Sequence, residues 1–175
     1  MSDKYDKMKL DNQICFAFYV CSKEIIRKYQ DLLKPYNLTY THYITMLALF
    51  EQDNVMVKEL GKKLYLDSGT LTPLLKKLEA HGYITREKSL HDERNVYVKL
   101  TAEGWELRDK MIDIPDKIID KMFENAPQKP KNSNFLLSTV HEINKIMTKK
   151  RKKWLIFFFF YVIILNVRRN YAGVV

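Results

Sequence analysis

Residues 66–82, LDSGTLTPLLKKLEAHG, constrain the fold of this chain more than any other stretch. Leucines recur there at the spacing of one helical face, and threonines and lysines occupy the opposite side. Asp67 or Ser68 can cap the start of such a helix, Gly82 can end it, and Pro73 is expected near its start, where a missing N–H costs little. The pattern predicts a helix that docks on a core through Leu71, Leu74, Leu75 and Leu78. Taken alone, it also fits an ordinary amphipathic surface helix.

The flanking segments narrow this choice. Residues 57–65 predict a second short amphipathic helix, separated from the first by a tight turn. Residues 83–88 and 94–100 are strand-like, and residues 89–93 join them as a hairpin. Helix, turn, helix and hairpin in this order are typical of winged helix-turn-helix proteins, which read DNA with the second helix.

Polar and cationic side chains lie where such a fold would meet DNA. On the predicted second helix they are Ser68, Thr70, Thr72, Lys76 and Lys77, and on the wing they are Arg86, Asp92 and Arg94. We expect the helix residues to contact bases and phosphates in the major groove and Arg94 to enter the minor groove. The alternative for Arg94 is a salt bridge to Asp92 or Glu93, which would also serve to aim its side chain.

The net charge of +9 does not itself indicate DNA binding, because residues 1–125 contain equal numbers of acidic and basic side chains. The local placement of cations carries that argument. Two cysteines without a CxxC motif and the absence of a signal peptide favour a reducing cytoplasm.

Residues 10–33 predict a long helix on which Cys15, Tyr19 and Tyr29 share one stripe. Tyr19 is one turn from Cys15, whereas Tyr29 is about 21 Å from Cys15 along the helix axis at ~1.5 Å per residue. Tyr29 therefore reaches a Cys15 only if a second copy of the helix crosses it antiparallel, as in a homodimer with a two-fold axis. A lone cysteine on an apolar helix is otherwise a small buried hydrophobe.

The run LYLDSGTLTPLLKKLE, followed by a wing containing DER, resembles the MarR family of winged-helix regulators. The resemblance is strongest to its branch of organic hydroperoxide repressors (OhrR) and their staphylococcal relatives, and it covers residues 9–119 most densely. It implies that Cys15 is a redox sensor whose thiolate is supported by Tyr19, Tyr29 and Tyr40. The chemistry agrees, since phenolic O–H donors favour a thiolate and the thiolate attacks peroxides.

Cys21 lies about 240° around the helix from Cys15 at ~100° per residue, so the two thiols cannot pair within one chain. No cysteine near the C-terminus stands ready to resolve an oxidised Cys15. The chain thus resembles the one-cysteine class of these sensors, in which a small cellular thiol caps the oxidised cysteine.

The remaining helices are expected at residues 41–51, at 101–123 with a kink at Pro115, and at 135–147. We expect a mainly α fold with a small β-hairpin wing (α+β), built as one domain over residues 1–150. Within it, residues 10–50 and 101–148 would dimerise and residues 55–100 would bind DNA.

Residues 151–175 depart from the family pattern. Residues 149–153 read KKRKK, and the twelve apolar residues 154–165 give about 18 Å of helix, which is too short for the ~30 Å of a bilayer core. Three interpretations remain open: an interfacial membrane anchor, an apolar segment buried against the dimer, or a tail appended by an altered reading frame, which is slightly favoured.

No motif for nucleotide binding or hydrolysis occurs, and the four histidines lack metal-ligand spacing, so we expect no enzyme activity, cofactor or metal. The leading hypothesis is a homodimeric repressor that binds a pseudo-palindromic operator in double-stranded DNA. It would release that operator when an organic hydroperoxide, with a small thiol, oxidises Cys15. The alternatives are a repressor controlled by a small ligand or acting as a global virulence and redox regulator, and a membrane-peripheral interaction protein built around the tail.

Overall fold

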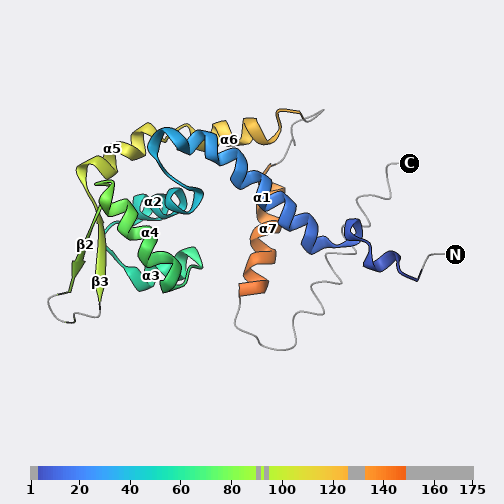
Figure 1. Cartoon of the computed structure of the whole chain (residues 1–175), viewed down its shortest axis with the longest axis horizontal. Coiled ribbons are helices and arrows are strands. Elements are labelled where there is room, and N and C mark those ends of the chain that lie inside the picture. The colour runs from blue at the N-terminus through green and yellow to red at the C-terminus, as the bar shows by residue number, and fades with distance from the viewer. Residues whose placement is uncertain (1–3, 90–91, 93–94, 126–132, 149–175) are drawn as a thin grey trace. The chain divides into compact units, whose positions relative to one another are not determined.

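The computed structural model describes residues 4–89, 92, 95–125 and 133–148 (Figure 1). They belong to two compact units, residues 1–126 and residues 127–175. The second unit contributes one described helix, α7 (Ser133–Thr148), where the sequence predicts residues 135–147. A single domain over residues 1–150, and the part of α7 in dimerisation, stay predictions.

The first unit is mainly helical, with one small antiparallel sheet. Its α-helices are α1 (Ile14–Leu33), α2 (Tyr40–Glu51), α3 (Val57–Leu64), α4 (Ser68–Ala80), α5 (Ala102–Lys110) and α6 (Ile114–Met122). Its strands are β1 (Val55–Met56), β2 (Ile84–Lys88) and β3 (Val96–Leu100). Short 3-10 turns occupy Asp6–Met8, Leu10–Asn12 and Lys34–Tyr36. The predicted fold class, a mainly α protein with a winged helix-turn-helix, is confirmed.

The core lies where α2, α3, α4 and the sheet meet. All four leucines predicted to dock α4 are buried, as are Leu60 of α3 and Val98 of β3. Gly82 follows α4 with a φ of +78°, the left-handed conformation expected of a helix stop. The apolar pattern of residues 66–82 therefore predicts the packing of α4 correctly.

The sheet contains one strand more than the hairpin expected from the sequence. β2 and β3 pair from Ile84 opposite Leu100 to Lys88 opposite Val96, and β1 pairs with the other edge of β3, with Val55 opposite Val98. The strand order is β1-β3-β2. Because β1 has only two residues, it shows no alternation that sequence reasoning can detect.

Two predicted helix boundaries are wrong. The first helix begins at Ile14 rather than at residue 10, because Gln13 is extended and its side-chain amide donates to the carbonyls of Lys7 and Lys9 at 2.7 and 3.2 Å. Residues 101–123 form two helices instead of one kinked helix. Pro115 lies in the first turn of α6, where its missing N–H is not needed.

Helices α1 and α6 lie side by side (Figure 1). Helix α1 also packs on α2 and on the 3-10 turn Lys34–Tyr36, which follows α1. The only buried residue of α1 is Leu33, at its C-terminal end. Its N-terminal part exposes apolar side chains, with Ile14 at 58% and Phe18 at 45% exposure. In the part of the chain that the structure describes, no helix has the length and apolar character needed to cross a membrane. The tail at residues 149–175 lies outside the described residues.

Candidate nucleic-acid interface and thiol site

The start of α4 is held by Asp67, the cap residue expected from the sequence. Its carboxylate accepts the backbone N–H of Thr70 at 2.8 Å and lies 3.4 Å from the Thr70 hydroxyl. The hydrogen bonds from the Thr70 amide and hydroxyl hold the pKa of Asp67 below its usual value. Asp67 thus remains charged near neutral pH, and its carboxylate interacts favourably with the positive N-terminal end of the α4 dipole.

The expectation for Pro73 is wrong, because this residue lies inside α4 and beyond its first turn. The missing N–H would have bonded to the carbonyl of Gly69, four residues earlier. Both residues are on the exposed side of the helix, where water can satisfy that carbonyl. The helix therefore tolerates Pro73 because the carbonyl of Gly69 is exposed to water. On the buried side of the helix, the same carbonyl would have no hydrogen-bond partner.

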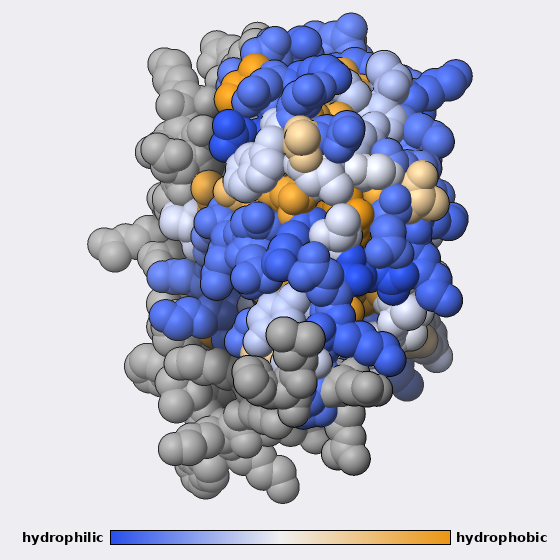
Figure 2. Space-filling model, turned by 90° about the vertical axis from the view of Figure 1, so that its left-hand side faces the viewer, coloured by the Kyte–Doolittle hydropathy of each residue, from blue (hydrophilic) through white to orange (hydrophobic). Residues whose placement is uncertain are grey.

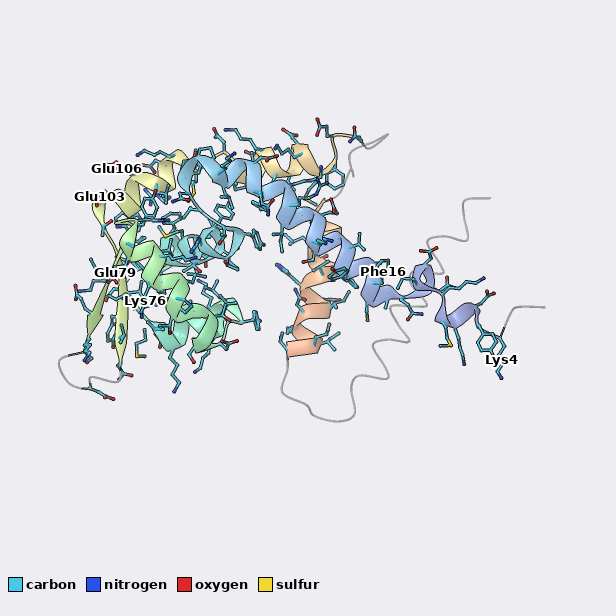
Figure 3. The ribbon with its side chains drawn as sticks, in the orientation of Figure 1. Lys4, Phe16, Lys76, Glu79, Glu103 and Glu106 are labelled. Atoms are coloured by element: carbon cyan, nitrogen blue, oxygen red, sulfur yellow. The ribbon has the colours of Figure 1, made fainter. Side chains whose placement is uncertain are left out.

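The five polar residues assigned to α4 are all exposed, namely Ser68, Thr70, Thr72, Lys76 and Lys77. The buried leucines on the other side of the helix fix this orientation. Figure 3 shows Lys76 and Glu79 one turn apart on α4. The end of the unit that carries α4, β2 and β3 presents a mostly hydrophilic surface (Figure 2). An exposed polar helix on a rigid core is what insertion into a major groove requires.

Arg86 forms an ion pair with Glu79 within the chain, and its predicted contact with DNA stays a prediction. Its guanidinium donates to Oε2 of Glu79 from Nε at 3.0 Å and from Nη2 at 2.5 Å, and the Arg86 backbone N–H donates to Oε1 at 3.2 Å. The hydrogen bond from Arg86 also lowers the pKa of Glu79. Arg86 therefore ties the wing strand β2 to α4, instead of projecting freely toward a phosphate.

The tip of the wing is described only in part. Asp92 is exposed, its carbonyl accepts the Asn95 backbone N–H at 2.9 Å, and its carboxylate accepts the Asn95 side-chain amide at 3.3 Å. Arg94 lies outside the described residues, and its place in a minor groove stays a prediction.

Two cations that sequence reasoning overlooked lie on α3. Lys58 and Lys62 are exposed and four residues apart, so they share one face of the first helix of the helix-turn-helix. In this motif the first helix crosses the DNA backbone, where lysines neutralise phosphates. The K-x-x-x-K spacing of residues 58–62 is the sequence signal that could have identified these two lysines.

Within one chain, Cys15 and Tyr19 lie at the opposite end of α1 from Tyr29 and Tyr40. Cys15 and Tyr19 are exposed on the N-terminal part of α1. Tyr29 packs on Tyr40 and Tyr43, with ring centroids 4.9 and 5.4 Å apart. Burial, followed by the neighbouring phenols, raises the pKa of Tyr29 to about 12, and burial also raises the pKa of Tyr40. These phenols keep their protons at neutral pH and can act as hydrogen-bond donors.

Comparison with known proteins identifies the fold family. An organic hydroperoxide resistance transcriptional regulator from Bacillus subtilis (strain 168) aligns over its whole length with 82% of this chain, at 44% identity over 147 residues. The chain belongs to the MarR/SarA family of winged-helix transcriptional regulators. The family model for transcriptional regulators SarA/Rot matches residues 27–111. The transcriptional regulator SarZ of Staphylococcus saprophyticus is 47% identical over 112 residues, which is 64% of this chain and 77% of SarZ.

Among solved structures, reduced AbfR bound to DNA matches with a TM-score of 0.65 and 28% identity, covering 82% of this chain and 96% of AbfR. AbfR is a protein of Staphylococcus epidermidis. This MarR/SarA-family chain is thus a DNA-binding transcriptional regulator, and its relatives are regulators rather than enzymes.

Substitution of Lys76, which is exposed on α4, and of Arg86, which is paired with Glu79, should change the salt dependence of DNA binding differently. We expect Lys76→Ala to weaken DNA binding and to reduce the slope of log K against log salt by about one for each DNA-bound subunit, because each subunit loses one phosphate contact. Arg86→Ala should weaken binding with no change in slope, because it acts by positioning the wing. Fluorescence anisotropy across a salt series measures both. A reduced slope for Arg86→Ala would show that Arg86 contacts a phosphate.

Proposed function

We propose that this regulator is a homodimeric repressor that releases its operator when an organic hydroperoxide oxidises Cys15. The observation that carries the proposal is the exposed apolar face of α1, which bears Cys15 and Tyr19 at one end. The protonated cluster of Tyr29 and Tyr40 lies at the other end. A second copy of α1 crossing antiparallel would cover that face and would place each Cys15 near the tyrosines of the partner.

The redox step requires the thiolate, the peroxide and one proton from water. The Cys15 thiolate attacks one peroxide oxygen, the O–O bond breaks, and a sulfenic acid and an alkoxide form; the alkoxide then takes a proton from water to give the alcohol. A small cellular thiol then condenses with the sulfenic acid to give a mixed disulfide and water. The adduct is larger than a thiol, so it would separate α1 from the phenols and change the distance between the two α4 helices.

The relatives support this chemistry. The Bacillus subtilis protein is an organic hydroperoxide resistance regulator. AbfR, at 28% identity, has been solved in a reduced and an overoxidised DNA-bound form and in a disulfide form. A dimer with two recognition helices would bind a pseudo-palindromic operator with half-sites about one helical turn apart.

The test uses a duplex selected from a random library with the reduced full-length protein. Its affinity is measured by fluorescence anisotropy at fixed salt, before and after an organic hydroperoxide is added together with a small thiol. We expect the wild type to release the duplex and Cys15→Ser to hold it, with Cys21→Ser as the matched control that still responds. Release by Cys15→Ser would contradict the thiol switch.

A second candidate is control by a small ligand. An open cavity of about 250 Å³ lies between α2, β1 and α3, and it is lined by Ala48, Gln52, Val55, Glu59, Leu60 and Lys63. In the same assay, release of DNA by a phenolic ligand in both the wild type and Cys15→Ser would favour this candidate over the peroxide sensor.

A further inference from the structure

Two histidines join the start of α2 to the end of the recognition helix α4. His42 lies in the first turn of α2 and is 6% exposed. His81 is the C-cap residue of α4, and the two ring centroids are 6.5 Å apart. The helix that carries the DNA-contacting residues is thus seated against α2 through a pair of titratable rings.

The hydrogen bonds of His42 require a neutral ring. Thr39, the N-cap residue of α2, donates its backbone N–H to His42 Nδ1 at 3.1 Å, and its hydroxyl oxygen accepts the His42 backbone N–H at 3.4 Å. Since a backbone N–H can only donate, Nδ1 must carry a lone pair and the ring proton must be on Nε2. The Thr39 hydroxyl lies 2.9 Å from the same Nδ1 and can donate to it as well. A protonated imidazole would have hydrogens on both nitrogens, so Nδ1 would lose the bond from the Thr39 backbone N–H and could only donate to the Thr39 hydroxyl oxygen.

The surroundings of His42 also oppose a positive charge. Burial lowers the pKa of His42, and Lys77 and His81, which face it from α4, lower that pKa further. His81 also contacts Asn37 and Tyr83: Asn37 Nδ2 lies 3.4 Å from His81 Nε2, and the ring of Tyr83 meets the His81 ring edge-on at 5.9 Å. His81 Nδ1 is buried and makes no hydrogen bond.

We propose that His42 is a proton-operated latch on the recognition helix. When His42 takes up a proton in mildly acidic solution, the Thr39 backbone N–H loses its acceptor and Lys77 repels the new charge. The packing of the recognition helix α4 against α2 is then weakened, and the affinity for DNA falls. This response is separate from peroxide sensing, and only its effect on DNA depends on the proposed function.

The direction of the pH effect follows from the two states of His42. The ring is harder to protonate in the folded chain than in the unfolded chain, where its pKa is about 6.5. The unfolded chain therefore binds more protons below pH 6.5, and the folded state loses stability as the pH falls. Since one proton is involved, the unfolding equilibrium constant rises by at most about tenfold per pH unit from this site.

Urea unfolding at pH 7.5 and 5.5 tests the latch at a fixed concentration of full-length protein. His42→Gln keeps an oxygen that can accept the Thr39 N–H, as in an ordinary capping box, and cannot be protonated. We expect its unfolding constant to change less between the two pH values than that of the wild type, by up to roughly tenfold for the single pH unit below 6.5. The matched control His141→Gln, at an exposed position of α7, should behave like the wild type. Equal pH dependence of His42→Gln and wild type would overturn the proposal.

If His42→Gln does not fold, hydrogen exchange of the wild type decides the question. After correction for intrinsic rates, lower pH should reduce protection in residues 39–43 and 78–82 more than elsewhere, and a uniform change would overturn the latch. Anisotropy with the selected duplex adds the DNA effect: the wild type should bind more weakly at pH 5.5 than at pH 7.5, and His42→Gln should not. Unchanged wild-type affinity would overturn the coupling to DNA. A failure to bind any duplex at pH 7.5 would instead contradict the proposed function and leave the unfolding test decisive.

Discussion

A mixed dimer of one Cys15→Ser subunit and one Tyr29→Phe subunit is expected to react with peroxide at the wild-type rate, although both parent homodimers are impaired. Cys15 and Tyr29 are separated by about 21 Å along α1 at ~1.5 Å per residue. In the proposed antiparallel dimer, a working site would therefore take its thiol from one subunit and its phenol from the other. In the mixed dimer, the remaining Cys15 faces an intact Tyr29 of its partner.

The expected size follows from the hydrogen bond that is lost. A hydrogen bond to a charged group contributes about 1.5–3 kcal/mol, so oxidation of Cys15 in the Tyr29→Phe homodimer should slow by roughly 10- to 100-fold. Stopped-flow measurement of thiol loss after mixing with an organic hydroperoxide gives the rate.

Tyr19 provides the matched control for this experiment, because it lies one turn from Cys15 on the same helix. A mixed dimer of Cys15→Ser and Tyr19→Phe subunits should react as slowly as the Tyr19→Phe homodimer. If the Tyr29→Phe mixed dimer is also slow, each site is contained within one chain, and the antiparallel arrangement of α1 is excluded.

The largest loss of stability is expected for Leu78→Ala. Leu78 is fully buried beneath α4, between the recognition helix and the core. Removing its side chain leaves a cavity and should lower the free energy of unfolding by about 2–5 kcal/mol. Leu47→Ala is the matched control, because Leu47 is 37% exposed on α2 and should lose much less. Urea unfolding at one protein concentration measures both, and equal losses would contradict the packing of α4.

Much of the helix-turn-helix and wing can be predicted because its signals are local. The leucines of α4 repeat at helical spacing, and Asp67 and Gly82 have the chemistry of a helix cap and a helix stop. Each of these patterns reflects contacts within a few residues or one buried face. The exposure of the five polar residues on α4 follows directly from the burial of its leucines.

The features decided by tertiary structure involve pairs of residues that are distant in sequence or signals too short to read. Arg86 meets Glu79 only because the wing folds back on α4, and β1 exists only because Val98 is opposite Val55. Gln13 makes the first helix begin later than expected, because its side-chain amide donates to the carbonyls of preceding residues. His42 and His81 are unremarkable in sequence and become a coupled pair when α4 packs on α2. The periodicity of the sequence predicts which face of a helix or strand is buried. Only the tertiary structure decides which distant side chains contact that face.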